Sequence, residues 1–272
     1  MLRLSLLLSL VTFSLHAQTI DRVISLSPST TELAYAAGLG EKLIAVSEHS
    51  DYPEFATKLD KVANYQGINI ERIISLQPDL ILAWPAGNPA QDLAKLRQFG
   101  FHIYNAKATS LEDIALNIER LSQYSDDPTQ GQSVADNFRS QLIQLKQKYN
   151  TTQSVSYFYQ LSEKPIITVA QENWPSEVFS FCGGKNVFAN SSVPYPQVGI
   201  EQVILANPEV IFTSRNAIEN GSMWQPWNEQ LQALQNKHMW TLSSDWINRP
   251  TYRTLHAITQ VCELFETVRQ KR

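Results

Sequence analysis

The chain has 272 residues, of which 43% are hydrophobic and 18% are charged. This composition excludes a disordered, collagen-like or disulfide-knot protein, and the length predicts one large domain or two lobes. The formal net charge is −4 and the sequence contains no run of Lys and Arg, which disfavours a nucleic-acid-binding surface because such surfaces need clustered cations.

Residues 1–17 have the features of a secretory signal peptide. A short positive segment ends at Arg3, an apolar run covers residues 4–15, and the small residue Ala17 provides a cleavage point. The run is too short to span a bilayer, which takes about 20 residues. A buried N-terminal helix is the alternative, but no helix cap precedes the run, so export is the interpretation that we prefer.

Short apolar runs alternate with helical patterns between residues 18 and 126. Strands are expected at 22–26, 42–46, 80–84 and 102–105, and helices at 32–37, 70–76, 90–99 and 111–124. This alternation predicts a parallel sheet covered by helices on both faces, and therefore an N-terminal α/β lobe.

A helix is expected to join the two halves of the chain over residues 127–150. Asp127 and Pro128 are typical of a helix start, and apolar residues then recur at helical spacing. These apolar residues are Val134, Phe138, Leu142, Leu145 and Tyr149. Residues 151–272 form the second α/β lobe, with strands expected at 155–160, 166–169 and 210–214 and a long helix at 252–270.

The chain contains two cysteines, Cys182 and Cys262. An even number of cysteines in an exported protein predicts a disulfide. Two unpaired buried thiols are the alternative. A metal site is disfavoured because no further Cys or His lies at chelating spacing beside either residue.

An internal repeat relates the two halves. Residues 70–82 align without gaps on residues 200–212, a shift of 130, with five identical positions in thirteen. The same shift superposes Tyr65 on Tyr195 and Glu71 on Glu201. Each copy predicts a short helix, a Pro turn and a buried strand, so the lobes are expected to be two versions of one unit. A chance match of Pro turn and strand is the alternative, and it explains the paired glutamates less well.

No catalytic motif occurs in the sequence, and its five histidines are scattered. The candidate functional residues are aromatic instead. Tyr52, Tyr65, Trp84 and Tyr195 lie near Pro or Gly at predicted strand ends, where parallel sheets place their ligand clefts. Each one alone is compatible with a core or rim position, but together they favour a cleft with flat apolar walls.

A charged pair and an indole follow a short strand expected at 241–243. They are Asp245, Trp246 and Arg249. Asp245 and Arg249 either belong to the cleft or pair only with each other at the surface, a contact worth under about 1 kcal/mol.

Eight segments together resemble the periplasmic cobalamin-binding proteins of ABC importers, which belong to the helical-backbone (class III) family of substrate-binding proteins. The segments are SPSTTEL (27–33), HSDYP (49–53), YQG (65–67), IERI (70–73), PDLI (78–81), CGG (182–184), PYPQV (194–198) and SDW (244–246). The resemblance covers the whole chain after residue 17. The first and fifth segments are shared with haem- and siderophore-binding relatives, whereas PYPQV with SDW is more specific.

This resemblance implies two Rossmann-like lobes joined by a single long helix, with one corrinoid in the cleft between them. It implies a monomeric periplasmic protein that captures cobalamin (vitamin B12) and delivers it to an ABC permease and its ATPase. Cobalamin is then a transported ligand, and no cofactor, metal site, enzymatic activity or nucleic-acid partner is expected. A haem or siderophore binder of the same family and an exported α/β enzyme are the alternatives.

The resemblance also assigns roles by position. Tyr65, Trp84 and Tyr195 would pack on the ligand, while Asp245 and Arg249 would meet its polar periphery. His49, Tyr52 and Trp246 complete the expected ligand-binding set, Glu71 and Glu201 would dock the permease, and Cys182 would be bonded to Cys262. Where a member of the family carries Trp, positions 65 and 195 are Tyr, which gives smaller platforms. His49 replaces a Tyr, and it either lines the cleft or approaches the cobalt.

Overall fold

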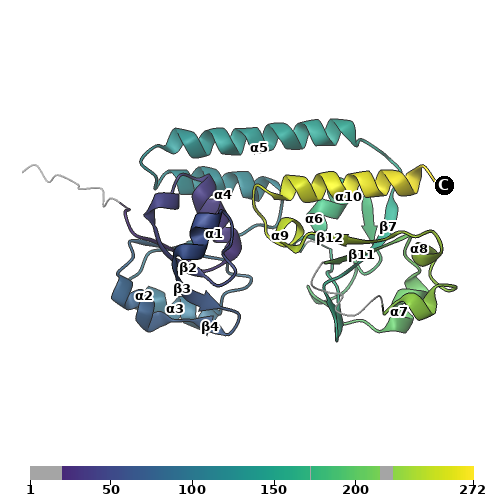
Figure 1. Ribbon diagram of the computed structural model, residues 1–272, viewed down its shortest axis with the longest axis horizontal. Coiled ribbons are helices and arrows are strands. Elements are labelled where there is room, and N and C mark those ends of the chain that lie inside the picture. The colour runs from purple at the N-terminus through teal and green to yellow at the C-terminus, as the bar shows by residue number, and fades with distance from the viewer. Residues whose placement is uncertain (1–19, 172, 215–222) are drawn as a thin grey trace, which may run out of the picture.

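A computed structural model describes residues 20–171, 173–214 and 223–272. The predicted signal peptide, residues 1–17, lies outside the described residues. Figure 1 shows two α/β lobes side by side, with helix α5 running along both of them. The predicted fold class, α/β with two lobes, is confirmed.

The N-terminal lobe is built on a six-stranded sheet in the order β4-β3-β2-β1-β5-β6. Its strands are β1 (Val23–Ser25), β2 (Leu43–Ser47), β3 (Asp60–Asn64), β4 (Gly67–Ile68), β5 (Leu80–Ala83) and β6 (Ile103–Asn105). Its helices are α1 (Pro28–Ala36), α2 (Ile70–Leu76), α3 (Ala90–Gln98) and α4 (Glu112–Ser122), with 3-10 turns at Gly40–Lys42 and Glu54–Lys58. All neighbouring strands are parallel except β3 and β4, which form an antiparallel hairpin.

The central strands of this sheet are the apolar runs that the sequence predicts. Val23, Ile24, Leu80 and Ile81 are fully buried, as expected where helices cover both faces. No strand is expected from the sequence at β3 or β4, because β3 contains Asp60, Lys61 and Asn64 and β4 has only two residues. The hairpin therefore has no apolar run to mark it.

Helix α1 begins earlier than expected, at Pro28. The Ser27 side chain accepts a hydrogen bond from the backbone N–H of Thr30, and the Thr30 side chain accepts one from the N–H of Ser27. This reciprocal capping, with proline in the first turn, fixes the start of the helix. It also places Glu32 inside the helix, where its side chain points to the other lobe.

The C-terminal lobe has a four-stranded parallel sheet in the order β10-β7-β11-β12. Its strands are β7 (Val155–Gln160), β10 (Gly184–Asn186), β11 (Val210–Ser214) and β12 (Met239–Leu242), beside a separate hairpin of β8 (Ser162–Glu163) and β9 (Ile166–Ile167). Its helices are α6 (Ser176–Phe181), α7 (Ile200–Ala206), α8 (Gln232–Gln235), α9 (Ser244–Ile247) and α10 (Thr254–Arg269), with a 3-10 turn at Gln225–Trp227. The strand expected at 166–169 is thus only the two-residue β9, outside the main sheet.

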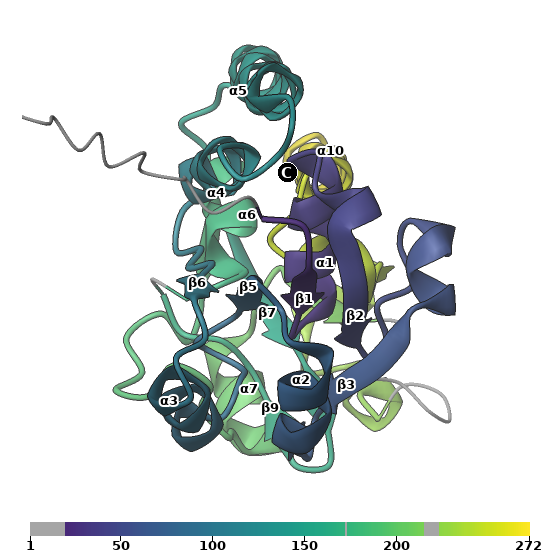
Figure 2. The same cartoon turned by 90° about the vertical axis from the view of Figure 1, so that its left-hand side faces the viewer.

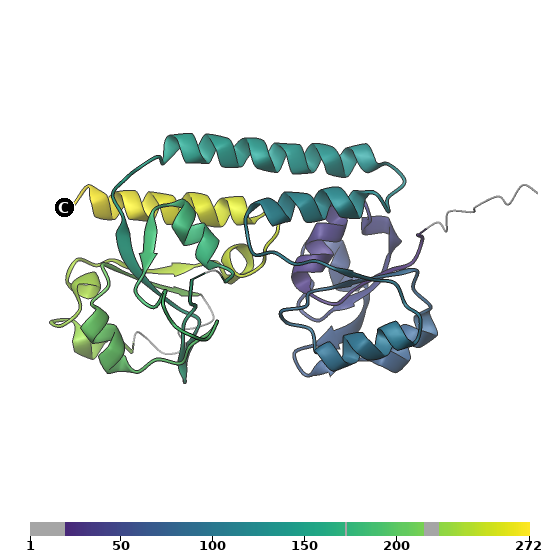
Figure 3. The ribbon, with the colours of Figure 1, turned by 180° about the vertical axis from the view of Figure 1, so that it is seen from behind.

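Helix α5 (Pro128–Lys148) is bound to both lobes. In the end-on view (Figure 2) and from behind (Figure 3), helix α5 lies over α4 and α10 and away from α2 and α3. Arg139 pairs with Glu112 and Glu119 of α4 at 2.7 and 2.8 Å. Toward the other lobe, the Gln141 amide donates to the Tyr252 hydroxyl at 2.6 Å. The connection is therefore a braced helix and not a flexible linker.

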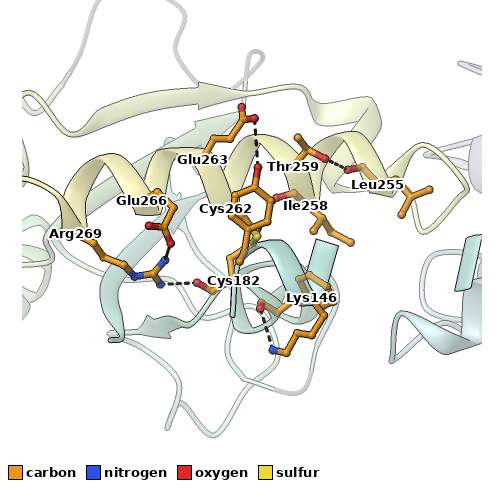
Figure 4. Close-up of a disulfide and its surroundings, with 11 residues drawn as sticks. Lys146, Cys182, Leu255, Ile258, Thr259, Cys262, Glu263, Glu266 and Arg269 are labelled. Carbon is orange, nitrogen blue, oxygen red and sulfur yellow. Dashed lines mark hydrogen bonds and ion pairs between the residues drawn. A yellow bond between two sulfur atoms is a disulfide. The ribbon is translucent and has the colours of Figure 1, made fainter. Parts of the chain in front are cut away.

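Cys182 and Cys262 form a disulfide that ties α6 to α10 inside the C-terminal lobe (Figure 4). Both residues are fully buried. The Arg269 guanidinium donates to the carbonyl of Cys182 at 2.6 Å, and Lys146 of α5 donates to the carbonyl of Phe181 at 3.3 Å. The disulfide expected from the sequence is present, and it stabilises the C-terminal lobe.

Burial of His238 makes the stability of the C-terminal lobe sensitive to acid. The side chain is 3% exposed and stacks on Trp240. Burial lowers the pKa of His238 below its usual 6.5. The neutral imidazole is favoured in the folded state, so this contribution to stability is full above about pH 6.5 and is lost as the pH falls further.

We therefore expect His238→Gln to remove part of the acid sensitivity. The wild-type free energy of unfolding in urea should fall more steeply between pH 7.5 and 5.5 than that of the variant, by up to about 1.4 kcal/mol per pH unit. His102→Gln is the matched control, because His102 is exposed. Parallel pH profiles of wild type and His238→Gln would contradict the assignment.

Candidate ligand-binding site

A cavity of about 200 Å³ lies between the two lobes. Trp84 of the N-terminal lobe forms one side of it. The remaining lining comes from the C-terminal lobe: Leu161, Trp174, Pro175, Tyr195, Asn248 and Pro250. The walls are therefore mostly aromatic rings and prolines with few polar groups, which suits the apolar face of a flat ligand.

Trp84 is positioned by the turn that follows β5. Its backbone N–H donates to the Asn88 side chain at 2.7 Å, and the Asn88 amide donates to the carbonyl of Leu26 at 2.9 Å. The indole occupies the space beside Gly87, where a Cβ would lie 2.0 Å from the ring. Glycine is needed at this position because any side chain would displace Trp84.

Trp174 is a lining residue that the sequence analysis missed. Pro175 follows it directly, so the rule that selects Trp84 and Tyr195, an aromatic residue beside proline, also selects Trp174. The Trp174 indole N–H donates to the carbonyl of Ile247 at 2.9 Å, and the Tyr195 hydroxyl donates to the carbonyl of Trp174 at 3.3 Å. Partial burial raises the pKa of Tyr195, which keeps its hydroxyl protonated.

Five charged side chains form an interlobe charge cluster: Glu32, Asp51, Asp245, Arg249 and Arg253. Arg249 contacts Glu32, Asp51 and Asp245 at 3.3, 2.7 and 3.0 Å. Arg253 donates to both carboxylate oxygens of Glu32. Because Arg249 stands in the chain between two lining residues of the cavity, the cluster adjoins that cavity.

The cluster is buried at its centre and open at its edge. The side chains of Glu32 and Arg249 are 4% and 14% exposed, whereas those of Asp51 and Asp245 are 53% and 46% exposed. Partial burial alone would raise the pKa of Asp51, but the hydrogen bond and charge of Arg249 outweigh it and lower this pKa. Asp51 is therefore an ionised partner of Arg249 at neutral pH. The sequence predicts Asp245 and Arg249 as site residues, but it contains no signal for Glu32 and Asp51.

Tyr52 lies at a second interlobe cavity of about 250 Å³. Its ring faces the Arg253 guanidinium, 4.2 Å from ring centroid to the central carbon. Glu32, Tyr35, Ala36, Pro53, Tyr252 and Arg253 complete the lining. Tyr52 is thus next to the charge cluster but not in the cavity that contains Trp84.

Three other residues expected at the ligand are outside the Trp84 cavity. Tyr65, in the turn between β3 and β4, is 88% exposed. Trp246 packs on His256 with 5.0 Å between ring centroids. His49 is exposed and has a left-handed backbone (φ 61°), and its carbonyl, rather than its imidazole, accepts from Arg249 at 3.3 Å. A ligand-binding role for these three stays a prediction.

Glu71 and Glu201 occupy equivalent positions in the two copies of the repeat. Each is exposed in the first turn of a seven-residue helix, α2 or α7. Both helices end at a left-handed residue, Gln77 (φ 45°) or Asn207 (φ 40°), before the Pro turn and the buried strand. Figure 1 shows α2 and α7 at the ends of the lobes that face away from α5. The predicted repeat unit of helix, turn and strand is confirmed.

Residues 20–171, 173–214 and 223–272 contain no helix that is long and apolar enough to cross a membrane. In the same ranges, no group of three or more His, Cys, Asp or Glu side chains is arranged to hold a metal ion.

Comparison with known proteins identifies the family. Residues 23–245 match the family model described as periplasmic binding protein, so the chain belongs to that family. It is 66% identical over 255 residues to the vitamin B12-binding protein of Vibrio parahaemolyticus, covering 94% of this chain and 93% of the relative. It is similar to the crystal structure of the periplasmic vitamin B12-binding protein BtuF of Vibrio cholerae, with 59% identity, a TM-score of 0.90 and coverage of 93% and 99%.

More distant structures share only the fold. The periplasmic haem-binding protein RhuT from Roseiflexus is 21% identical, with a TM-score of 0.80, and the comparison covers 92% of this chain and 99% of that one. The two lobes joined by a helix are therefore a scaffold on which different ligands are bound, and the ligand must be argued from the cleft.

The charge cluster yields a first test of the interlobe contact. Glu32→Gln removes the carboxylate that both Arg249 and Arg253 contact. The two largely buried guanidiniums then lose part of the negative charge that balances them. We expect a loss of about 2 to 4 kcal/mol in the free energy of unfolding, measured in urea at pH 7. Glu41→Gln is the control, since Glu41 is exposed and is not one of the five residues of the cluster. Equal stability of the two variants would show that the cluster is not a structural contact.

Proposed function

We propose that the chain is a periplasmic substrate-binding protein that captures cobalamin and delivers it to an inner-membrane ABC permease with its ATPase. The observation that carries the proposal is a cavity walled by Trp84 of one lobe and Trp174 and Tyr195 of the other. The named relatives at 59% and 66% identity are vitamin B12-binding proteins, and this supports the same ligand here.

A corrinoid fits the chemistry of this site. Its broad faces need aromatic and aliphatic contact, and its rim of amides needs a few fixed polar groups. The cavity of about 200 Å³ takes in only part of so large a ligand, so the rest lies across its mouth. We expect the exposed ring of Tyr65 and the half-exposed Asp51 and Asp245 to contact that outer part of the ligand. The cobalt is coordinated by the corrin itself, so the site needs no protein metal-ligand cluster.

Delivery is the second half of the proposal. The exposed Glu71 and Glu201 stand at equivalent places on two repeated units, and a permease built with two-fold symmetry can meet both with one basic patch on each subunit. An acid in the first turn also stabilises its own helix by about 0.3 to 1 kcal/mol. This local role is the alternative, and it predicts normal transport after substitution.

The alternatives differ in what they bind or convert. A haem binder of the same fold would take a ligand with carboxylates, which the carboxylates at the open edge of this cleft would repel, and a siderophore binder would take a ferric chelate. An exported enzyme would need converging acid, base or nucleophilic groups. Titration of the purified protein with cyanocobalamin, haemin and a ferric siderophore separates the binders. Absence of cyanocobalamin binding would reject the proposed function.

Trp84→Ala tests the cavity. Loss of the indole should weaken cyanocobalamin binding by roughly 1 to 3 kcal/mol through lost apolar contact, as measured by titration calorimetry. Phe99→Ala removes a similar ring from an exposed site at the end of α3 and is the control. If Trp84→Ala binds as tightly as Phe99→Ala while both stay folded, Trp84 is not part of the binding site.

Charge reversal tests docking. The double variant Glu71→Lys, Glu201→Lys should bind cyanocobalamin with unchanged affinity but fail to support uptake by permease-containing vesicles, because like charges at an interface cost several kcal/mol. Glu41→Lys with Glu229→Lys reverses two exposed acids outside α2 and α7 and should leave uptake normal. Normal uptake by the first pair would reject the docking role and leave the binding role intact.

A further inference from the structure

The open edge of the interlobe charge cluster carries hydrogen-bond acceptors next to Arg249, whose chain neighbours Asn248 and Pro250 line the Trp84 cavity. Arg249, the cation at this edge, is already engaged. One terminal nitrogen contacts Glu32 and Asp51, and the other contacts Asp245 and the carbonyl of His49. Asp51 and Asp245 keep about half of their side-chain surface exposed. A ligand that reaches this edge therefore meets carboxylate oxygens, which accept hydrogen bonds and donate none when ionised.

Two further cations lie near this edge, Arg253 and Lys61. Arg253 is bound to both oxygens of the buried Glu32 and covers the Tyr52 ring. Lys61, whose charge acts on Asp51, donates its ammonium to the carbonyl of Ala56 at 2.9 Å. A ligand carboxylate that approached Arg249, or the two nitrogens of Arg253 that contact Glu32, would have to displace an acid, and the displaced acid would then lose its own compensation.

We propose that Asp51 and Asp245 are specificity determinants that admit tetrapyrroles with amide side chains and exclude those with carboxylate side chains at this edge. The inference rests on the proposed function, which supplies the tetrapyrrole. A primary amide donates N–H groups to carboxylate oxygens, so it is satisfied where it lies. A ligand carboxylate of the same shape finds no donor there and lies beside two like charges. Because this group is unpaired and partly desolvated, the protein should bind the carboxylate ligand much more weakly than the amide ligand.

This mechanism separates corrinoids from haem without any difference in fold. The haem-binding relative RhuT has the same architecture. Haem carries two carboxylates at its edge, whereas cobalamin carries amides. Apolar walls attract both macrocycles alike, so the walls alone select neither of them. The carboxylates of Asp51 and Asp245 supply the difference in affinity between the two macrocycles.

The sharpest test changes one ligand group at a time. The probes are cyanocobalamin and its monocarboxylic acid derivatives, in each of which a single peripheral amide is hydrolysed to a carboxylate. The corrin, the cobalt and its axial ligands stay the same. Affinities are measured by calorimetry at pH 8, where histidine side chains are neutral, for wild type and for Asp51→Asn with Asp245→Asn. Asp136→Asn, on α5, removes one exposed carboxylate far from the cleft and is the control.

We expect wild type and Asp136→Asn to bind at least one derivative tenfold or more weakly than cyanocobalamin. The double Asn variant, which keeps amide oxygens as acceptors but has no charge there, should bind that derivative within about threefold of cyanocobalamin. The wild-type difference should also shrink when NaCl is raised from 20 to 500 mM, because salt screens exposed charges. Haemin should bind the double variant more tightly than it binds wild type.

Other outcomes overturn the inference. If every derivative binds wild type like cyanocobalamin, the edge does not discriminate against carboxylates. If the tenfold loss persists in the double variant, other residues are responsible. If cyanocobalamin itself does not bind wild type, the proposed function fails, and this result is distinct from the first two because they both require a protein that binds cyanocobalamin.

Discussion

Glu32 is a buried acid from one lobe held between two arginines of the other. Among the described residues, every ion pair that joins the two sheet-bearing lobes belongs to this cluster. Burying these charges is costly, and the cost is offset only while the two lobes keep the geometry that brings the partners together. The cluster therefore fixes where the lobes stand relative to each other. The shape of the cavity follows from that position, because Trp84 approaches from one lobe and Trp174 and Tyr195 from the other.

Two contacts at separate levels hold the lobes. Helix α5 is bound to α4 through Arg139 and to the start of α10 through Gln141. The charge cluster holds the lobes again, near the cavity. A hinge motion of the lobes would disturb both the contacts of α5 and the charge cluster. Large hinge motions of the kind seen with flexible linkers are therefore disfavoured. A binding protein of this design recognises its ligand with walls that are already in place.

The sequence predicts most of the fold because the relevant signals are local. Apolar runs mark the buried strands, Asp127 with Pro128 marks the start of the helix that joins the lobes, and the repeat at 70–82 and 200–212 marks two related units. The hairpin of β3 and β4 escapes detection because polar residues dominate it. For the site, an aromatic residue beside proline finds Trp84 and Tyr195 and would also have found Trp174. The partners of Arg249 could not be found, because Glu32 and Asp51 stand 217 and 198 residues away and nothing local links them.

The internal repeat places an exposed acid in the first turn of a short helix on each lobe, and this duplication creates an ambiguity of orientation. Any two-fold symmetric partner would accept both orientations equally if the copies were the same. They differ most visibly four residues after each acid, where Leu205 is 89% exposed and its counterpart is the polar Ser75. The exposed apolar side chain of Leu205 therefore distinguishes the two places, and it makes one way of approaching a partner different from the other.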